Sequence, residues 1–491
     1  MVTNYTTVIG LEVHVQLATA SKLFCGCSTR FGAEPNTQTC PVCIGMPGTL
    51  PVINRAAVRL ALKTAVALNC EIPPRTKWDR KQYYYPDLPK NYQISQYDLP
   101  LSQHGYLEIS DPKERFAAKR VGIIRAHLEE DAGKSLHDEV AGKADSFIDL
   151  NRTGTPLLEI VTAPDLRSSA EAHTFLKELK LLLTYLGVSD CNMQEGSLRV
   201  DANINLHVET PGGTVATPIV EVKNMNSFRA VERAMDCEAD RQFREWQETG
   251  RLLGQSPKQT RGWDDAAGVT RPQRGKEESS DYRYFPDPDL IPVAFTSDEI
   301  ASARASLGEL PAALRERIES QYQVPAYDAD VLVNQGRSVV EYFLAVADRC
   351  QDGKAASNWV TQDVQRVLKE RGISIEQLPV TSAALAELIA KIKAGELPSS
   401  RARDVLGTMI ANQVDVGDAM RSLGIASVDA AELTALCARL VAANPKIAGD
   451  VRNGKTQAVG ALVGQAKQSN PNVDPNRVRE LCLQLILAAS G

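Results

Sequence analysis

The stretch IGLEVHVQL, residues 9–17, alternates between apolar and polar side chains. Successive residues of a β-strand point to opposite faces, so Glu12, His14 and Gln16 would share one face and the leucines and valines the other. This pattern predicts a strand that packs one face on a core and presents the other to solvent or to a ligand. An ordinary surface strand gives the same alternation, so neighbouring motifs have to distinguish the two.

Two later segments set carboxylates in or beside apolar, strand-like runs. They are HLEEDAGK at residues 127–134 and TPLLEIV at residues 155–161. Glu159 lies among leucine, isoleucine and valine, where an uncompensated anion is costly to bury, so a cation is expected beside it. Several carboxylates with at most one imidazole suit Mg²⁺ or Mn²⁺ better than Zn²⁺, and Mg²⁺ commonly holds nucleotide phosphates. These segments therefore predict a site for a hard cation.

Further polar side chains follow the same alternation. GSLRVDANINL places Arg199, Asp201 and Asn203 on one strand face. The aromatic segment DRKQYYYPDLPKNYQISQ contributes Lys81 and Lys90 as binders of phosphate or carboxylate, and its tyrosines as stacking surfaces. A tyrosine-rich turn in a core, or plain surface strands, would give similar patterns. Several polar-faced strands in one region nevertheless predict an antiparallel sheet with a polar, ligand-facing concavity.

Four of the ten cysteines fall within CGCSTRFGAEPNTQTCPVC, residues 25–43. C-x-x-C is the usual spacing of a zinc-binding pair, and Gly26 gives the less common C-x-C the freedom to form a tight turn. Four thiolates suit a closed structural zinc site, which leaves no open position for a reacting water. Buried thiols and a redox-active C-x-x-C are the alternatives, although the βαβ context of a redox motif is missing. The predicted zinc ligands are Cys25, Cys27, Cys40 and Cys43.

Length and composition suggest several domains. The chain has 491 residues and a formal net charge of −6, and at about 150 residues per domain this length suggests about three domains. Neither a signal-peptide pattern nor a membrane-spanning apolar run is found, so a cytoplasmic location is expected. The six scattered cysteines are expected to fill apolar space in the cores. Near residue 295, strand-like alternation gives way to helical patterns rich in Ala, Leu, Glu and Lys.

Taken together, these motifs resemble those of one family, the GatB-type subunits of the tRNA-dependent amidotransferases. The matching stretches are IGLEVHVQL, FGAEPNTQTCPVCIGMPGTLPV, DRKQYYYPDLPKNYQISQ, HLEEDAGKS, DLNRTGTPLLEIV, GSLRVDANIN, EVKNMNSFRAV, QTRGWDD and SSDYRYFPDPDL, with ANPK and GKTQAVGALVGQ in the tail. The resemblance implies an α+β fold in three domains. They are an antiparallel cradle similar to the glutamine synthetase catalytic fold over 1–295 with a zinc-binding insert at 25–43, a helical domain over 296–410, and a YqeY-like tail over 411–491.

The resemblance also implies the reaction. In the family, ATP phosphorylates the side-chain carboxylate of the misattached residue on Glu-tRNA(Gln) or Asp-tRNA(Asn), and ammonia then displaces phosphate to leave the amide. Phosphorylation is needed because a carboxylate resists attack by ammonia, whereas phosphate is a good leaving group. The sequence shows neither the Gly/Ser-rich stretch of a Ser-Ser-Lys amidase nor a Cys-His glutaminase pairing. Ammonia is therefore expected from the family's amidase subunit, which works with a further small subunit in the GatCAB heterotrimer.

Carried over residue by residue, the resemblance assigns Mg²⁺ to Glu12, His14, Glu130 and Glu159. Sequence leaves open whether Glu129 or Glu130 faces the metal. Roles around phosphate, substrate or metal fall to Lys81, Lys90, Arg199 and Asp201. The cysteine cluster corresponds to the family's structural zinc site, which some members lack, so it is not expected to take part in the reaction.

The tail is the locally basic part of an acidic chain. From Arg439 to Glu480 it has seven Lys or Arg against three Asp or Glu. With the resemblance, this excess predicts contacts to tRNA phosphates. The residues concerned are Lys446, Arg452, Lys455 and Lys467. A helical bundle with ordinary surface lysines would have the same composition.

Two other functions fit parts of the sequence. A zinc-containing module that only recruits tRNA would have the cysteines and the basic tail, but it would leave the carboxylate-bearing strands unexplained. A small-molecule amide ligase of the glutamine synthetase type would need neither the basic tail nor tRNA. Mg²⁺-dependent ATP turnover on a misacylated tRNA would separate all three.

Overall fold

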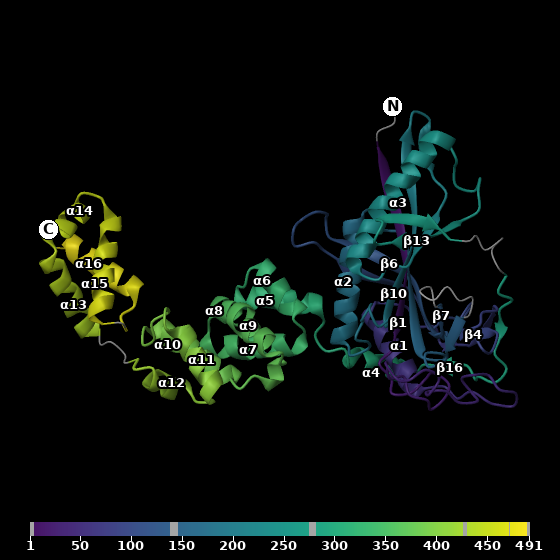
Figure 1. The fold of residues 1–491 in the computed structure, drawn as a ribbon, viewed down its shortest axis with the longest axis horizontal. Coiled ribbons are helices and arrows are strands. Elements are labelled where there is room, and N and C mark those ends of the chain that lie inside the picture. The colour runs from purple at the N-terminus through teal and green to yellow at the C-terminus, as the bar shows by residue number, and fades with distance from the viewer. Residues whose placement is uncertain (1–3, 138–145, 274–280, 426–429, 471, 489–491) are drawn as a thin grey trace. The chain divides into compact units, whose positions relative to one another are not determined.

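The computed structural model describes residues 4–137, 146–273, 281–425, 430–470 and 472–488. The chain forms two compact units, Met1–Pro311 and Ala312–Gly491 (Figure 1). The first unit combines a large sheet with helices, and the second is helical. The α+β fold class expected from the sequence is therefore confirmed.

A nine-stranded sheet forms the centre of the first unit. Its strands are β1 Tyr5–Gln16, β5 Ser102–Ile109, β6 Lys119–Glu130, β9 Pro156–Thr162, β10 Leu198–Thr210, β11 Gly213–Ala216, β12 Val220–Lys223, β13 Gln259–Asp264 and β14 Val269–Pro272. Their order is β14-β13-β12-β10-β1-β9-β6-β5, and β11 pairs with β10 off this path. The expected antiparallel pairing holds except between β12 and β13, which are parallel. Helix α3, Phe228–Thr249, connects these two strands, and such a crossover is what a parallel pair requires.

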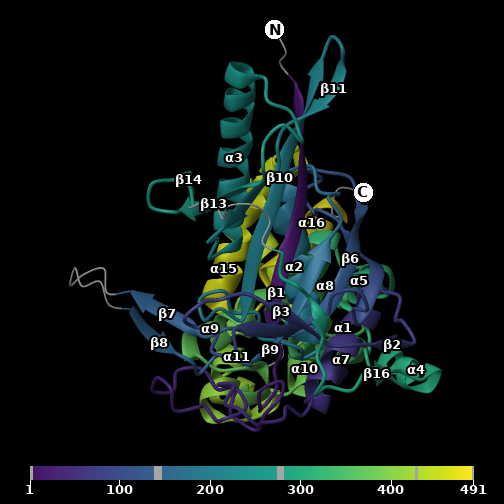
Figure 2. The same ribbon diagram turned by 90° about the vertical axis from the view of Figure 1, so that its right-hand side faces the viewer.

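Three helices cover the apolar face of this sheet: α1 Arg55–Ala67, α2 Ser169–Tyr185 and α3. Figure 2 shows α2 and α3 beside the long strands β1 and β10. Leu11, Val13 and Val15 of β1 are buried in this core, whereas the polar residues between them lie on the other face. Ser168 caps the start of α2, and α3 ends at Gly250 with a φ of 65°.

The other described strands form three small sheets. Their strands are β2 Arg75–Thr76, β3 Asp79–Gln82, β4 Tyr92–Ser95, β7 Lys134–His137, β8 Ser146–Asp149, β15 Phe285–Pro286 and β16 Val293–Ala294. The β15-β3-β4 sheet is anchored to β6, where Nε2 of Gln93 donates to the carbonyl of Glu130 at 2.7 Å. This contact holds the aromatic segment, with Lys81, over the polar face.

The boundary between the units differs from the expected one by one helix. Helix α4, Ser297–Ala305, packs on α1 and belongs to the first unit. The sequence placed it with the helical region because its composition is helical. None of its side chains is buried, so it has no apolar stripe to indicate what it packs on.

The second unit consists of short helices. They are α5 Pro311–Tyr322, α6 Ala326–Asn334, α7 Arg337–Cys350, α8 Gly353–Asn358, α9 Gln365–Arg371, α10 Ser382–Ala394, α11 Ala402–Asn412, α12 Val416–Ser422, α13 Ala430–Ala443, α14 Pro445–Arg452, α15 Val459–Ser469 and α16 Pro475–Ala488. A π-helical turn, Trp359–Val364, joins α8 to α9, and α13–α16 share an apolar core of their own. Of the isolated cysteines, only Cys237 is not fully buried. Over the described part of the chain, no helix combines the length and apolarity needed to span a bilayer.

Candidate active site and metal centre

Side chains on the polar face of the large sheet form two rows. One row consists of His127 on β6, Glu159 on β9, His14 on β1 and Arg199 on β10. The next row consists of Arg125, Val161, Glu12 and Asp201 on the same four strands. Because strand residues alternate between faces, each strand supplies both the core and this polar surface. The polar face predicted from the sequence is therefore present.

A compact cluster of acidic and imidazole groups is centred on the first row and includes Glu129 beside it. Nε2 of His14 lies 3.4 Å from Oε2 of Glu159 and 3.9 Å from Oε1 of Glu129. One ligand atom from each of these three residues lies within 4.8 Å of the others, and both carboxylates are buried. Nε2 of His127 is 3.7 Å from the same Glu159 oxygen. Buried carboxylates with imidazole nitrogens at these distances fit a divalent cation.

The charges in this cluster stabilise one another. Burial opposes a charged imidazole, but the hydrogen bond to Glu159 and the charges of Glu159 and Glu129 raise the pKa of His14. Burial also opposes a charged carboxylate, but His127, His14 and Lys81 lower the pKa of Glu159 below its usual value. Glu159 therefore stays ionised and presents a negative charge to a cation.

A cavity of about 420 Å³ opens beside the cluster. It is lined by His14 and Glu129 together with Lys81, Arg199 and Asp201, which come from β3 and β10. The structure thus brings three of the four residues expected around phosphate or substrate next to the cluster. Lys90 is the exception.

The cations on the cavity wall differ in their partners. Arg199 donates to Oδ2 of Asp131 at 2.7 Å, and Nζ of Lys223 lies 2.6 Å from Oδ2 of Asp201. Lys81, by contrast, has no carboxylate within 4.0 Å among the described residues. Burial lowers its affinity for a proton, but nearby carboxylates outweigh this and raise the pKa of Lys81. Lys81 is therefore a charged group that is free to meet an anion.

Glu12, Glu130 and Lys90 lie outside the cluster. Oε1 of Glu12 accepts a hydrogen bond from Nδ2 of Asn203 at 2.9 Å. Oε1 of Glu130 accepts one from Lys90 and, at 2.9 Å, one from the backbone N–H of Ile94. Lys90 and Glu130 line a different cavity, of about 180 Å³, beside the cysteines.

The metal ligands expected from the sequence, Glu12, His14, Glu130 and Glu159, are therefore brought together only in part. Glu129 occupies the place expected for Glu130. The reason is strand alternation, because Glu129 is two residues from His127 and shares its face, whereas Glu130 points to the other face.

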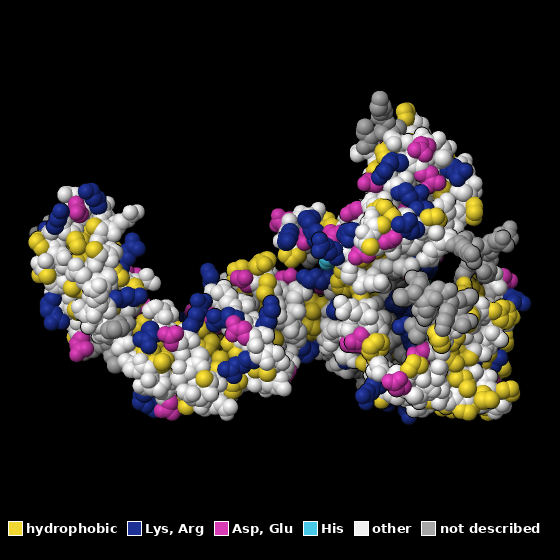
Figure 3. Space-filling view, in the orientation of Figure 1, with side chains coloured by type: hydrophobic (Ala, Val, Ile, Leu, Met, Phe, Trp, Pro, Cys, Tyr) yellow, Lys and Arg dark blue, Asp and Glu magenta, His cyan; other side chains and the backbone are white. Residues whose placement is uncertain are grey.

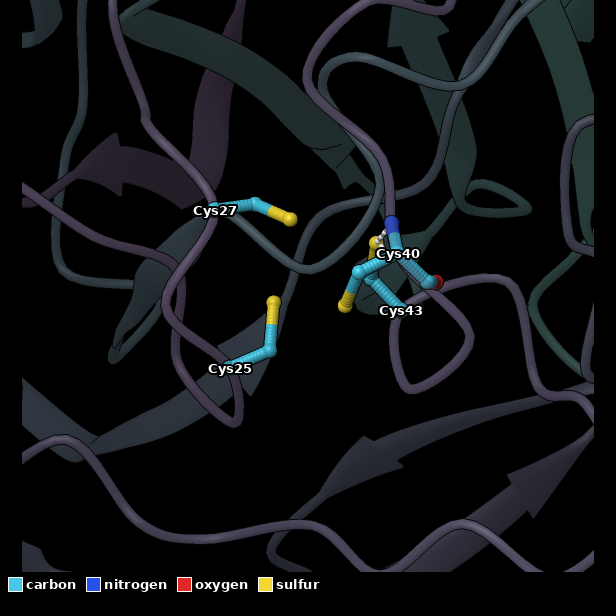
Figure 4. A group of neighbouring side chains, drawn as sticks. All are labelled: Cys25, Cys27, Cys40 and Cys43. Atoms are coloured by element: carbon cyan, nitrogen blue, oxygen red, sulfur yellow. Dashed lines mark hydrogen bonds between the residues drawn. The ribbon is translucent and has the colours of Figure 1, made fainter.

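The sulfurs of the cysteine insert face a common space (Figure 4). One ligand atom from each of Cys25, Cys27, Cys40 and Cys43 lies within 4.8 Å of the others. The backbone N–H of Cys40 donates to Sγ of Cys43 at 3.2 Å, and Nζ of Lys22 is 3.6 Å from the same sulfur. A hydrogen bond from the Cys25 thiol outweighs burial and, with the Cys40 N–H and Lys22, lowers the pKa of Cys43 to about 4. This geometry fits a closed tetrahedral zinc site.

Hydrogen bonds tie the insert to strand β8 and to the loop that joins β8 to β9. The backbone N–H of Gln38 donates to Oδ1 of Asn151 at 2.8 Å, and Nδ2 of Asn36 donates to the carbonyl of Ile148 at 2.9 Å. The loop leads directly into the strand that carries Glu159. The insert therefore braces one end of a site strand without contributing a side chain to the cluster.

Comparison with known proteins shows the family to which the chain belongs. Residues 7–301 match the model of the GatB/GatE catalytic domain, and residues 341–486 match that of the GatB domain. The B subunit of the aspartyl/glutamyl-tRNA(Asn/Gln) amidotransferase of Rhodopirellula baltica is 58% identical over 481 residues, or 98% of this chain and 97% of that protein. Those of Moorella thermoacetica and Thermosynechococcus vestitus are 48% and 47% identical, over 97% and 98% of this chain and 99% and 96% of theirs. The chain belongs to the GatB family. The resemblance drawn from the motifs is confirmed.

Three site residues of this GatB-family chain were missed by sequence reasoning: His127, Asp131 and Lys223. His127 lies beside Glu159, although the group that could hold a metal includes His14 as its one imidazole. Alternation within HLEED would have placed His127, Glu129 and Asp131 on one face. The same reasoning on VEVK would have shown Lys223 facing outward, as it does in β12.

The basic residues of the tail are exposed. Lys446 lies on α14, Arg452 ends that helix, and Lys467 lies on α15. Lys455 is 3.3 Å from Asp450. On the face shown in Figure 3, Lys and Arg side chains are spread over the α13–α16 bundle rather than gathered in one patch. Their exposure leaves them accessible to an anionic partner.

Proposed function

We propose that this chain is the subunit that activates and amidates the side-chain carboxylate of Glu on tRNA(Gln), of Asp on tRNA(Asn), or of both. The observation that carries the proposal is the cluster of His14, Glu129 and Glu159 beside a cavity of about 420 Å³ that Lys81 lines. Phosphoryl transfer depends on positioning and on neutralising charge, which a cation-binding cluster next to an unpaired lysine provides. Membership of the GatB family supports a substrate carried on tRNA.

The cluster would hold Mg²⁺ through His14, Glu129 and Glu159, and the ion would neutralise the phosphates of ATP. An oxygen of the substrate carboxylate attacks the γ-phosphorus, and ADP leaves with the electron pair of the broken P–O bond. The nitrogen of ammonia then attacks the acyl carbon, phosphate leaves with its bonding pair, and the nitrogen loses a proton to give the amide. Lys81 and Arg199 line the cavity beside the cluster, where they would meet one of the two substrate anions.

The remaining site residues have supporting roles in this proposal. Asp131 fixes the guanidinium of Arg199, and Lys223 fixes Asp201. Lys90 neutralises Glu130 and maintains the fold. Zinc held by the four cysteines would brace the loop before β9. Glu12 lies one row from the cluster and orders Asn203.

We also propose the partners and setting that the family implies. An amidase subunit, together with the small subunit of the GatCAB heterotrimer, would supply ammonia, since that activity was not found in the sequence. The tail over 411–491 would contact the tRNA body through Lys446, Arg452, Lys455 and Lys467, and the helical segment 296–410 would link it to the catalytic domain. All of these reactants meet in the cytoplasm.

Reconstitution of the reaction tests this proposal. The chain is combined with the amidase and the small subunit, then incubated with ATP, Mg²⁺, glutamine and either Glu-tRNA(Gln) or Asp-tRNA(Asn). We expect Gln-tRNA or Asn-tRNA, with one ADP released per amide formed. In a matched reaction, ammonium chloride replaces glutamine and the amidase is left inactive; amide formation should persist, because only the ammonia source has changed.

Other outcomes would identify the rival functions. Retention of tRNA with no ADP release on either substrate would overturn the proposal in favour of a recruitment module. Amide formation on free glutamate, without tRNA, would indicate a small-molecule ligase. The buried carboxylates favour catalysis over recruitment, because a module that only binds RNA has no use for them.

A further inference from the structure

Arg125 on β6 has a buried guanidinium nitrogen with no hydrogen-bond partner among the described residues. Its Nε is shielded from solvent and makes no hydrogen bond to any described residue. Over the same part of the chain, no carboxylate lies within 4.0 Å of the guanidinium. Arginine is always charged, and a buried donor that makes no hydrogen bond is unfavourable. This group therefore needs an acceptor from outside the described residues.

A β-bulge turns Arg125 onto the face of the cluster. The register between β6 and β9 shifts between Ile123 and Arg125, and Ile124 between them is 48% exposed. From Arg125 onward the strand alternates regularly, so Arg125 shares a face with His127 and Glu129, with Cα atoms about 7 Å apart at each second residue. Arg125 therefore lies one row from the imidazole and carboxylate groups.

The surroundings of Tyr284 support this placement. Burial raises the pKa of Tyr284, and the charges of Lys81 and Arg125 oppose this shift while those of Glu129 and Glu159 add to it. The tyrosine hydroxyl is thus within electrostatic reach of the two unpaired cations and of both cluster carboxylates. All of these groups border one polar region.

Other cations on the same face already have partners. Arg199 and Lys223 are each paired with an aspartate, at 2.7 Å and 2.6 Å. A paired cation attracts an added anion less strongly, because the charge of its partner opposes the attraction. Lys81 and Arg125 are therefore the groups from which attraction for a substrate anion is expected.

We propose that Arg125 binds an oxyanion of one of the two substrates, on the β6 side of the cluster. The oxyanion is either the terminal phosphate of the nucleotide or the side-chain carboxylate of the aminoacyl group. This inference rests on the proposed function. That reaction brings two anions together at one metal, and Arg125 lies outside the lining of the 420 Å³ cavity, so it can meet a second anion. A planar guanidinium suits bidentate binding of either oxyanion.

The test compares Arg125→Gln with Arg120→Gln in the complex reconstituted with the amidase and the small subunit. Arg120 is a matched control on the same strand, exposed and 2.8 Å from Glu108. ATP is titrated at saturating misacylated tRNA, and misacylated tRNA at saturating ATP. Thermal unfolding is followed for both variants. Arg125→Lys is included because it keeps the charge but loses the planar guanidinium that can donate two hydrogen bonds to one oxyanion.

We expect Arg125→Gln to raise the KM for either ATP or misacylated tRNA by about tenfold or more, because a charge-assisted hydrogen bond is lost. The Tm of this variant should be unchanged or higher. A rise in the KM for ATP identifies the phosphate, and a rise in the KM for tRNA identifies the carboxylate. Arg125→Lys should be intermediate and Arg120→Gln indistinguishable from wild type. Both KM values within twofold of wild type, or a lower Tm with unchanged KM values, would overturn the inference. An inactive wild-type complex would instead overturn the proposed function.

Discussion

Replacing Lys90 by methionine should destabilise the first unit, because Lys90 is the buried counter-ion of Glu130. The Lys90 side chain is 7% exposed and that of Glu130 only 2%. Lys90 donates to Oε1 of Glu130, and the backbone N–H of Ile94 reaches the same oxygen at 2.9 Å. Lys90→Met leaves the apolar stem in place and removes the charge. Glu130 is then a buried carboxylate with only one neutral donor at that oxygen.

The size of the effect follows from this burial. Removing one partner of a buried ion pair destabilises a protein by about 3–5 kcal/mol, whereas replacing both partners is often nearly neutral. At about 2 °C per kcal/mol for a unit of this size, Lys90→Met should lower Tm by about 6–10 °C. Adding Glu130→Gln removes the unpaired charge and keeps an acceptor for the Ile94 N–H. The double variant should therefore recover most of the loss.

Differential scanning calorimetry of the full chain measures both effects on the transition of the first unit. Lys113→Met is the matched control, since Lys113 is exposed and should change Tm by no more than about 1 °C. A Tm of Lys90→Met within about 2 °C of wild type would contradict this prediction, and so would a double variant no more stable than the single one. Either result would mean that Lys90 is not there to neutralise Glu130.

Three further predictions concern the metal sites and the tail. Glu159→Gln should reduce ADP release by at least about 100-fold, as expected for loss of a charged group at a catalytic metal, while filter binding shows tRNA affinity unchanged; continued turnover would contradict the metal assignment. Cys40→Ser should lower both the zinc content measured by mass spectrometry and Tm while some turnover remains, and one zinc per chain in this variant would argue against the four-cysteine site. Changing Lys446 and Lys467 together to glutamine should weaken tRNA binding and reduce the slope of log Kd against log salt by about 1–2, roughly one per phosphate contact; an unchanged slope would place the tRNA contact elsewhere.

Period-two alternation explains most of what the sequence could predict about the site. On β1 it separated Glu12 and His14 from the buried valines, and on β10 it did the same for Arg199 and Asp201. The same alternation was not applied to the adjacent glutamates of β6. It would have selected Glu129 rather than Glu130, because Glu129 shares the face of His127. The partners of the charged side chains could not be predicted from the sequence. Nothing in the sequence indicates that Lys90 meets Glu130 or that Arg199 meets Asp131, because those partners are 40 and 68 residues apart.

The boundary of the first unit is a second feature that the sequence did not predict. Helix α4 has the composition of the helices that follow it, yet it packs on α1. Composition reports helix propensity, which does not depend on the partner of the helix, whereas unit boundaries depend on tertiary contacts. The parallel pairing of β12 with β13 was missed for the same reason. A long helix between two strands permits a parallel pair and does not require one.

The sheet links core packing to chemistry, because the same strands serve both. On β1, Val13 is buried in the core and its neighbour His14 lies 3.4 Å from Glu159. A core change that shifts this strand by a fraction of an ångström changes the His14 and Glu159 spacing directly, and misplacement by about 1 Å is enough to cost about 100-fold in rate. The zinc insert also affects the position of a site strand, because a hydrogen bond from Gln38 to Asn151 ties the insert to the loop that leads into β9. Loss of zinc should therefore affect turnover through the position of Glu159, even though no cysteine lies in the cluster.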